Sequence, residues 1–164
     1  MFIFSFERRR GVKLAAILVF AVFLTALCVF VACERRDAVK GFATADEIGR
    51  YSTEASDTDA RLEFLAQFGI GAERDSESSD TVRVPNDFND AYTSYNDLQK
   101  AIGLNLEPFR GESVSRITYR IKNSKKTVTL LCFKARVIGG HISTGVYGDG
   151  YLSLGEMKKY GKTG

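Results

Sequence analysis

The residues best suited to chemistry in this chain are a histidine and a cysteine in its C-terminal half. His141 is the only histidine in the sequence, which excludes a metal site built from several histidines. Cys132 stands on what we expect to be a neighbouring strand, so a His141/Cys132 pair for nucleophilic catalysis can be drawn. However, Cys132 lies within the apolar run 127–134, where a thiol is buried and inert. We therefore predict that the chain is not an enzyme, and an envelope enzyme using His141/Cys132, or His141 with Asp149, remains the alternative.

Other patterns that are similar to functional motifs have simpler explanations. The sequence Gly148-Asp149-Gly150 is not followed by a suitable helix or by the further glycine of a phosphate-binding loop. The ligand series of a calcium loop is missing there as well. The acidic pairs Asp57/Asp59 and Asp87/Asp90 fall where we expect helices to begin, and helix capping accounts for them. The sequence therefore predicts no metal ion and no cofactor.

A row of basic side chains follows one predicted strand. In segment 114–122, the residues Arg116, Arg120 and Lys122 alternate with apolar residues, so they share the exposed face of a half-buried strand. Residues 108–164 hold eleven bases and three acids, whereas residues 44–107 hold fourteen acids and five bases. Either the two halves compensate each other, or the basic face binds an anionic partner such as a cell-wall polymer or a lipid headgroup. Nucleic acid is not expected, because no aromatic residue interleaves with these bases.

A long apolar segment determines where we expect these residues to be located. Segment 14–33 holds twenty consecutive residues without a formal charge, and a helix of this length spans a bilayer. The preceding residues 1–13 form a basic stub, and positive charge beside a spanning helix stays in the cytoplasm. We therefore predict a single-pass membrane protein that contacts the lipid bilayer through residues 14–33, with a cytoplasmic N-terminus and residues 34–164 outside.

Two alternatives for this segment remain open, and both also place the following chain outside the cytoplasm. The order of basic region, apolar run and small residue also fits a cleaved secretory signal. The sequence Phe30-Val31-Ala32-Cys33 is similar to a lipoprotein box, in which Cys33 is lipidated and becomes the new N-terminus. Phe30 departs from the leucine that is usual at that position of the box.

The chain beyond the apolar segment predicts one α+β domain. We expect a polar tether over residues 34–55 and an extracytoplasmic domain over residues 56–164. Helical periodicity and capping residues predict two helices, one from Ser56 to Gly69 and one from about Asn86 to Gly103. In the second helix an aromatic stripe of Phe88, Tyr92 and Tyr95 recurs at helical spacing, which favours a core position over a sugar- or peptide-stacking platform.

The polar segment 74–80 is expected to be a loop, and a short strand is expected over residues 81–84. The period then changes to two, which predicts an antiparallel meander with the two helices packed on one of its faces. The strands of this meander are expected over residues 114–122, 127–134 and 137–143. The pair Gly139-Gly140 in the last strand suggests a bulge or a close backbone approach, and a glycine-rich loop that includes Tyr151 is expected after it.

The order of several segments is similar to that of a known family. These are RLEFLAQFGI, then VRVPNDFNDAYTSYNDLQKAIGLNLEPFRG, then ITYRI and VIGGHIS. In this order they resemble domain-of-unknown-function family 4830 of Gram-positive bacterial membrane-anchored proteins, over about residues 58–152. His141 stands where the family pattern has an acid. The resemblance implies the fold and an envelope location, and it implies no activity, substrate or cofactor.

Taken together, these features predict a membrane-anchored extracytoplasmic interaction module without a catalytic site. Its expected partner is an anionic cell-wall polymer or another protein of the bacterial cell envelope. If the partner is anionic, we expect Arg116, Arg120 and Lys122 to bind it.

Overall fold

The computed structural model describes residues 19–26, 41–46, 48–145 and 150–156. The chain divides into two compact units, Met1–Ala38 and Val39–Gly164. In the first unit, the described residues 19–26 are helical. Its apolar side chains are exposed, including Phe20 and Phe23. Among the described residues, no helix has the length and apolar character needed to cross a membrane. The predicted stub 1–13, Cys33 and most of the predicted span lie outside the described residues.

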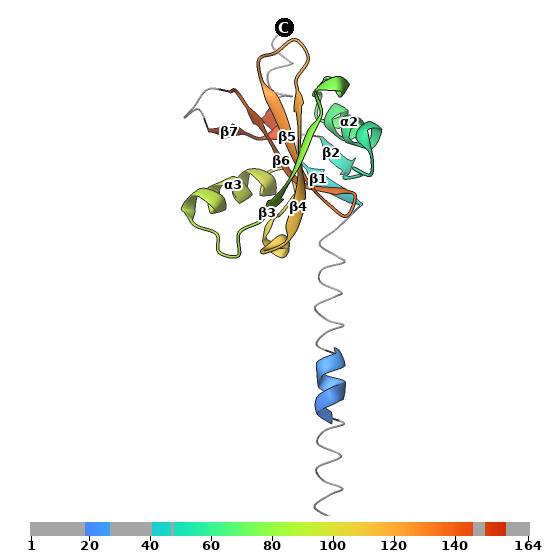
Figure 1. The fold of residues 1–164 in the computed structure, drawn as a ribbon, viewed down its shortest axis with the longest axis vertical. Helices are drawn as coiled ribbons and strands as arrows, with labels where there is room; N and C mark the ends of the chain where they lie inside the picture. Colours follow the sequence, from blue (N-terminus) through green and yellow to red (C-terminus); the bar gives the residue numbers. More distant parts are fainter. Residues whose placement is uncertain (1–18, 27–40, 47, 146–149, 157–164) are drawn as a thin grey trace, which may run out of the picture. The chain divides into compact units, whose positions relative to one another are not determined.

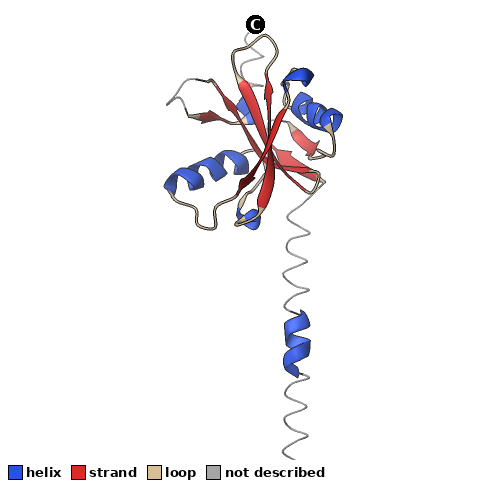
Figure 2. Ribbon diagram, viewed as in Figure 1, coloured by secondary structure: helices blue, strands red, loops and turns tan. Residues whose placement is uncertain are grey.

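A five-stranded antiparallel sheet forms the centre of the second unit, in the order β3-β4-β5-β6-β7 (Figures 1 and 2). Its strands are β3 (Ser78–Arg83), β4 (Ser113–Arg120), β5 (Thr127–Phe133), β6 (Arg136–Ser143) and β7 (Tyr151–Leu152). The three central strands of the meander are confirmed, with ends that differ by one or two residues from those predicted. The strand β3 begins within the segment 74–80 that we expected to be a loop, and β7 was not predicted.

The prediction of a polar tether over residues 34–55 is wrong for the second half of that segment, which is folded. Strands β1 (Phe42–Ala45) and β2 (Gly49–Ser52) pair as an antiparallel hairpin. Tyr51 is buried there, and its ring meets those of Phe64 and Phe68 at centroid distances of 5.9 and 5.0 Å. The hairpin therefore belongs to the folded unit. Four-residue strands with little apolar alternation carry too weak a signal to be recognised in the sequence.

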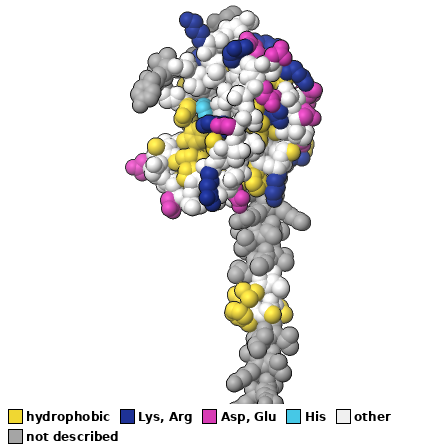
Figure 3. Space-filling model, in the orientation of Figure 1, with side chains coloured by type: hydrophobic (Ala, Val, Ile, Leu, Met, Phe, Trp, Pro, Cys, Tyr) yellow, Lys and Arg dark blue, Asp and Glu magenta, His cyan; other side chains and the backbone are white. Residues whose placement is uncertain are grey.

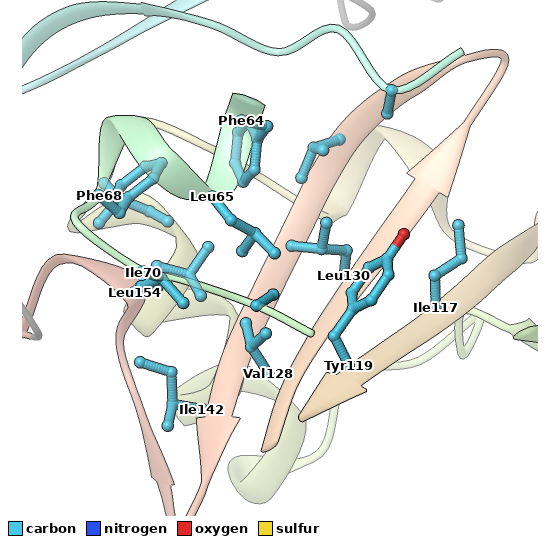
Figure 4. Close-up of a cluster of buried hydrophobic side chains, with 14 of the residues drawn as sticks. Phe64, Leu65, Phe68, Ile70, Ile117, Tyr119, Val128, Leu130, Ile142 and Leu154 are labelled. Carbon is cyan, nitrogen blue, oxygen red and sulfur yellow. The ribbon is translucent and has the colours of Figure 1, made fainter. Parts of the chain in front are cut away.

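Helix α2 (Thr58–Gln67) covers one face of the sheet, which we call the inner face. The Asp57 carboxylate accepts the Ala60 N–H at 2.9 Å and caps its first turn, and Gly69 ends it in the left-handed conformation. The apolar core lies between this helix and the strands (Figure 4). Its side chains include Phe64, Leu65, Phe68, Ile70, Ile117, Tyr119, Val128, Leu130, Ile142 and Leu154.

Helix α3 (Asp90–Lys100) lies on the opposite, outer face, so the prediction that both helices share one face is wrong. Figure 1 shows α2 and α3 on different sides of the strands. The fully buried residues of α3 are Asn96 and Gln99, which are polar. Gln99 reaches strand β6, where its Oε1 accepts the Gly140 N–H at 2.8 Å. Because apolar periodicity does not distinguish the two faces of a sheet, the sequence could not place this helix.

Two glycines of β6 leave no room for a side chain, and the first of them allows α3 to approach the sheet closely. A Cβ atom at Gly139 would lie 3.0 Å from a Leu106 methyl carbon and 3.3 Å from Gln99 Oε1. A Cβ at Gly140 would lie 2.9 Å from the Thr129 carbonyl oxygen. The pairing of β5 with β6 also shifts by one residue beside this point. Both interpretations of the glycine pair, a bulge and a close backbone approach, are therefore confirmed.

Three short 3-10 turns complete the described part of the second unit. They are Arg74–Ser76, Glu107–Phe109 and Leu154–Glu156.

Candidate functional site

The outer face of the sheet contains a hollow of about 230 Å³ that is partly open to solvent. Side chains from all five strands line it. We call this site the outer hollow, and its lining residues are Ser78, Asp80, Arg116, Thr118, Thr129, His141 and Tyr151. Helix α3 lies beside it on the same face, because Tyr95 of this helix is hydrogen-bonded to His141.

Strand register explains why these polar side chains meet. Ser78 pairs with Thr118, Thr118 pairs with Thr129, and Thr129 pairs with His141. Residues opposite each other in adjacent strands project to the same face, so the four side chains form one row across β3, β4, β5 and β6. The hydroxyl oxygens of Thr118 and Thr129 lie 3.0 Å apart in a hydrogen bond. The row gives the outer hollow a floor rich in hydroxyl groups.

One side of the outer hollow carries an ion pair. Arg116 Nε donates to Asp80 Oδ1 at 2.9 Å, and a second guanidinium nitrogen contacts Oδ2. The hydrogen bond from Arg116 holds the pKa of the Asp80 carboxyl below its ordinary value, and the same bond raises the pKa of Arg116. Both groups are therefore charged at neutral pH, and their charges cancel.

His141 is neutral in the outer hollow. Burial, and then the nearby charge of Arg116, lower the pKa of its imidazole to about 4. Its Nδ1 shares a hydrogen bond of 2.9 Å with the Tyr95 hydroxyl group. Its ring centroid lies 4.1 Å from that of Tyr151 and 5.5 Å from that of Tyr95. The hydrogen bond and the two rings hold the imidazole in place while its charge stays at zero.

An aromatic row leads from the outer hollow along α3. Ring centroids are 5.6 Å apart for Tyr151 and Tyr95, 5.6 Å for Tyr95 and Tyr92, and 4.6 Å for Tyr92 and Phe88. Tyr151 is 54% exposed, and the three residues of the α3 side are half-buried. Figure 3 shows the histidine in cyan between a hydrophobic patch and a neighbouring basic and acidic pair. The aromatic stripe therefore forms a partly exposed surface, whereas the sequence favoured a core position for it.

The three basic residues that we predicted as an anion-binding face have different environments. Arg116 lines the outer hollow and is paired with Asp80. Arg120 Nε donates to Glu73 Oε2 at 2.9 Å, outside the hollow. Lys122 follows the end of β4 and is exposed. The carboxylates neutralise two of these three cations, and the sequence could not show this because both acids are distant in the chain.

The predicted His141/Cys132 pair does not form in the structure. Cys132 lies in the core of the inner face, with its pKa raised to about 12, chiefly by burial. His141 lines the hollow on the outer face. The two residues lie on adjacent strands, as predicted, but Cys132 pairs with Val137 and His141 pairs with Thr129. The sheet therefore separates the two side chains. Asp149, the other partner that we considered for the histidine, lies outside the described residues.

A second polar cluster lies at the edge of the inner core. Arg61 Nε donates to the Tyr119 hydroxyl oxygen at 2.9 Å, and that hydroxyl donates to Glu77 Oε2 at 2.6 Å. Arg61 also forms an ion pair with Glu77 at 2.9 Å. Because every member is satisfied within the cluster, we assign it to joining α2, the segment before β3, and β4. Among the described residues, no group of acidic, histidine and cysteine side chains is arranged to hold a metal ion.

Sequence reasoning missed most of the outer hollow. Asp80 was placed in a loop, and Tyr151 was placed in a glycine-rich loop. The alternation of β4 identified Arg116 correctly as an outward residue. Asp80 reaches the outer hollow only through the pairing of β3 with β4, and Tyr151 reaches it only through the pairing of β6 with β7.

The fold and the hollow define an α+β domain with a polar site on its outer sheet face. A family model described as a domain of unknown function (DUF4830) matches residues 64–142. The resemblance to this family is therefore confirmed, over a shorter range than we predicted. Searches among curated proteins and among solved structures find no match.

Proposed function

We propose that this chain is a membrane-anchored extracytoplasmic interaction module, and that the outer hollow is its binding site for a cell-envelope component. The polar row across the sheet is the observation that carries this proposal. An antiparallel sheet commonly has one apolar face in the core and one polar face toward solvent, so the distinctive feature here is that polar side chains from five strands converge around one hollow. The outer hollow combines hydroxyl groups, a paired arginine, a neutral histidine and an exposed tyrosine, and convergent polar groups of this kind fix the orientation of a bound ligand.

The membrane location rests on the sequence. The uncharged segment 14–33 and the basic residues before it favour an anchor with the second unit outside. The exposed apolar side chains of residues 19–26 support contact with lipid. The expected partner is the cell wall or another envelope protein, and no cofactor is needed for this role.

Co-sedimentation of the full chain in mild detergent with purified cell-wall sacculi tests the proposal. We compare wild type with the double variant Asp80→Ala/Arg116→Ala. The matched control is Glu73→Ala/Arg120→Ala, which removes the same kind of ion pair from the same strand outside the hollow. Retention at physiological salt that is lost only in the first variant supports the proposal. Retention that disappears in both variants, or with added salt, indicates nonspecific charge and contradicts it.

Charge reversal of Arg116, Arg120 and Lys122 tests the broader basic face. We expect this triple variant to bind no worse than Arg116→Glu alone, because Glu73 already neutralises Arg120. A much larger loss in the triple variant would favour a basic face that extends beyond the hollow.

A further inference from the structure

We infer that the outer hollow binds a neutral sugar residue of a glycan, with the ring of Tyr151 and the hydroxyl-lined floor as its recognition elements. This inference deepens the proposed function and rests on it. It names the chemistry of the ligand, which the envelope location leaves open.

Charge is the first argument. The guanidinium of Arg116 is bound on two nitrogens by the Asp80 carboxylate. An anionic ligand would have to bind beside the like charge of that carboxylate, which already neutralises the guanidinium. His141 adds no positive charge at neutral pH, because its imidazole is neutral there. The outer hollow therefore has no net charge to attract an anion, although a basic residue lines it.

Hydrogen-bonding capacity is the second argument. Each hydroxyl group of Ser78, Thr118 and Thr129 can both donate and accept. The ion pair adds a carboxylate acceptor and guanidinium donors on the same face. A ligand that matches this site must itself present many groups that donate and accept, and sugar hydroxyls have this property. An apolar ligand would cover the donors and acceptors that these groups have left over without satisfying them, at a cost in affinity.

Shape is the third argument. A volume of about 230 Å³ is smaller than the range of about 300 Å³ and above that holds drug-sized molecules, so one ring fits better than several. Tyr151 is 54% exposed, and its ring stands at the hollow beside the imidazole of His141. An exposed tyrosine gives an apolar face and a polar tip, which suits a sugar ring. The rings of Tyr95, Tyr92 and Phe88 continue from there and offer contacts for further sugar residues of the glycan.

The single histidine provides a specific reporter for the test. Because the chain has one histidine, its imidazole ¹⁵N resonances in the full-length protein in micelles belong to His141 alone. We titrate neutral tetrasaccharides of glucose, mannose, galactose and N-acetylglucosamine, and tetragalacturonate as the anionic counterpart. At least one neutral tetrasaccharide is expected to shift these resonances saturably, and tetragalacturonate is expected to bind at least about tenfold more weakly.

Two variants and one control assign the binding to the named groups. Thr118→Val/Thr129→Val removes both partners of one hydrogen bond and keeps their shape, so the fold is expected to persist. Tyr151→Ala removes an exposed ring. Each is expected to weaken neutral-sugar binding by about tenfold, which corresponds to about 1.4 kcal/mol. Glu73→Ala/Arg120→Ala is expected to leave it unchanged.

The outcomes separate this inference from the proposed function. Stronger binding of tetragalacturonate than of every neutral sugar overturns the inference. So does the absence of any shift with the neutral panel while wild type is still retained by sacculi through Asp80 and Arg116. In that second case the proposed function stands and the ligand is not a neutral sugar. If wild type shows neither retention by sacculi nor binding to any neutral sugar, the inference and the proposed function are both overturned.

Discussion

The two faces of the sheet differ in how their covering helix meets the strands. On the inner face, α2 buries Phe64 and Leu65 against aliphatic and aromatic side chains, and polar contacts stay at the rim. On the outer face, α3 buries Asn96 and Gln99, and its aromatic residues remain half-exposed. The inner face derives its stability from apolar burial. The outer face also buries apolar residues, among them Val114 and Leu131, but it adds directional hydrogen bonds from α3 that hold side chains in place without filling the space beside the helix.

This difference indicates a division of roles within one sheet. Burial is nondirectional and tolerates small changes in angle, whereas hydrogen bonds fix positions. A binding site needs fixed side chains around an open space. In the function that we propose, the outer face provides that space, and the inner face provides the stability that allows it to remain open.

The largest expected effect separates the faces by stability. Phe64→Ala is expected to lower the free energy of unfolding by about 3–5 kcal/mol, because it leaves a cavity in the inner core. Tyr151→Ala on the outer face is expected to change it by no more than about 0.5 kcal/mol, since the side chain is 54% exposed. Urea unfolding followed by far-UV circular dichroism measures both. Equal losses would mean that Tyr151 is part of the core.

The second prediction concerns pH and the outer face. The pKa of His141 is 6.5 ordinarily and about 4 in the fold. Between these values the unfolded chain takes up a proton that the folded chain does not. The free energy of unfolding therefore falls as the pH falls from 6.5 to 4, by up to about 3 kcal/mol, and is unaffected by this group above 6.5. His141→Gln is expected to remove that slope. A slope that persists in the variant would contradict the neutral imidazole.

The inner face supplies a control in a different pH window. Burial alone would raise the pKa of Glu77, but hydrogen bonds from Tyr119 and Thr58 and the charge of Arg61 outweigh it and lower this pKa from 4.5. The stabilisation from Glu77 is therefore present above pH 4.5 and is lost as the pH falls below it. Glu77→Gln is expected to flatten the unfolding profile only in that acidic range.

The third prediction compares two glutamines that join a helix to backbone groups. Gln99→Leu is expected to cost about 1–3 kcal/mol, because it leaves the buried Gly140 N–H without its acceptor. Gln67 bonds both the N–H and the C=O of Ser52 at 2.8 and 3.0 Å, but it is only half-buried. Gln67→Leu is expected to cost less, about 0.5–1.5 kcal/mol, because water can replace its contacts. Thermal and urea unfolding measure both, and a larger cost at Gln67 would reverse the assignment of directional bonding to the outer face.

The smallest expected effect concerns a turn shared by both faces. Lys134 and Ala135 connect β5 to β6 with φ angles of 47° and 61°, a conformation that favours glycine. Ala135→Gly is expected to raise the free energy of unfolding by about 0.5–1 kcal/mol. Asn123→Gly is the control, because asparagine already tolerates its φ of 56° and less is gained. Because this turn belongs to neither face alone, neither change is expected to move the His141 resonances.

Part of this architecture was predictable because its signals are local. The cap at Asp57, the left-handed Gly69 and the alternation of β4 all act within a few residues, and the structure confirms each. The candidate site was predictable only in part. Alternation placed Arg116 on an exposed strand face, but the sequence carried no sign that Asp80 would neutralise it.

Helix α3 shows why the rest was not predictable. Its aromatic stripe at Tyr92 and Tyr95 has the spacing of a buried helix face, yet these residues are half-buried. The residues that are fully buried, Asn96 and Gln99, are polar and would be placed outside by any hydrophobic pattern. Gln99 can be buried only because a bulged strand of two glycines offers its Oε1 a free N–H.

The sequence by itself determined the periods, caps and turns of most elements, the apolar character of segment 14–33 and the resemblance over residues 64–142. These depend on interactions within one or two turns of chain. Tertiary structure alone decided which sheet face each helix covers, that β1 and β2 join the fold, and that Asp80, His141 and Tyr151 surround one hollow. Those outcomes depend on strand register between distant residues, and a shift of one residue would turn every side chain of a strand to the other face.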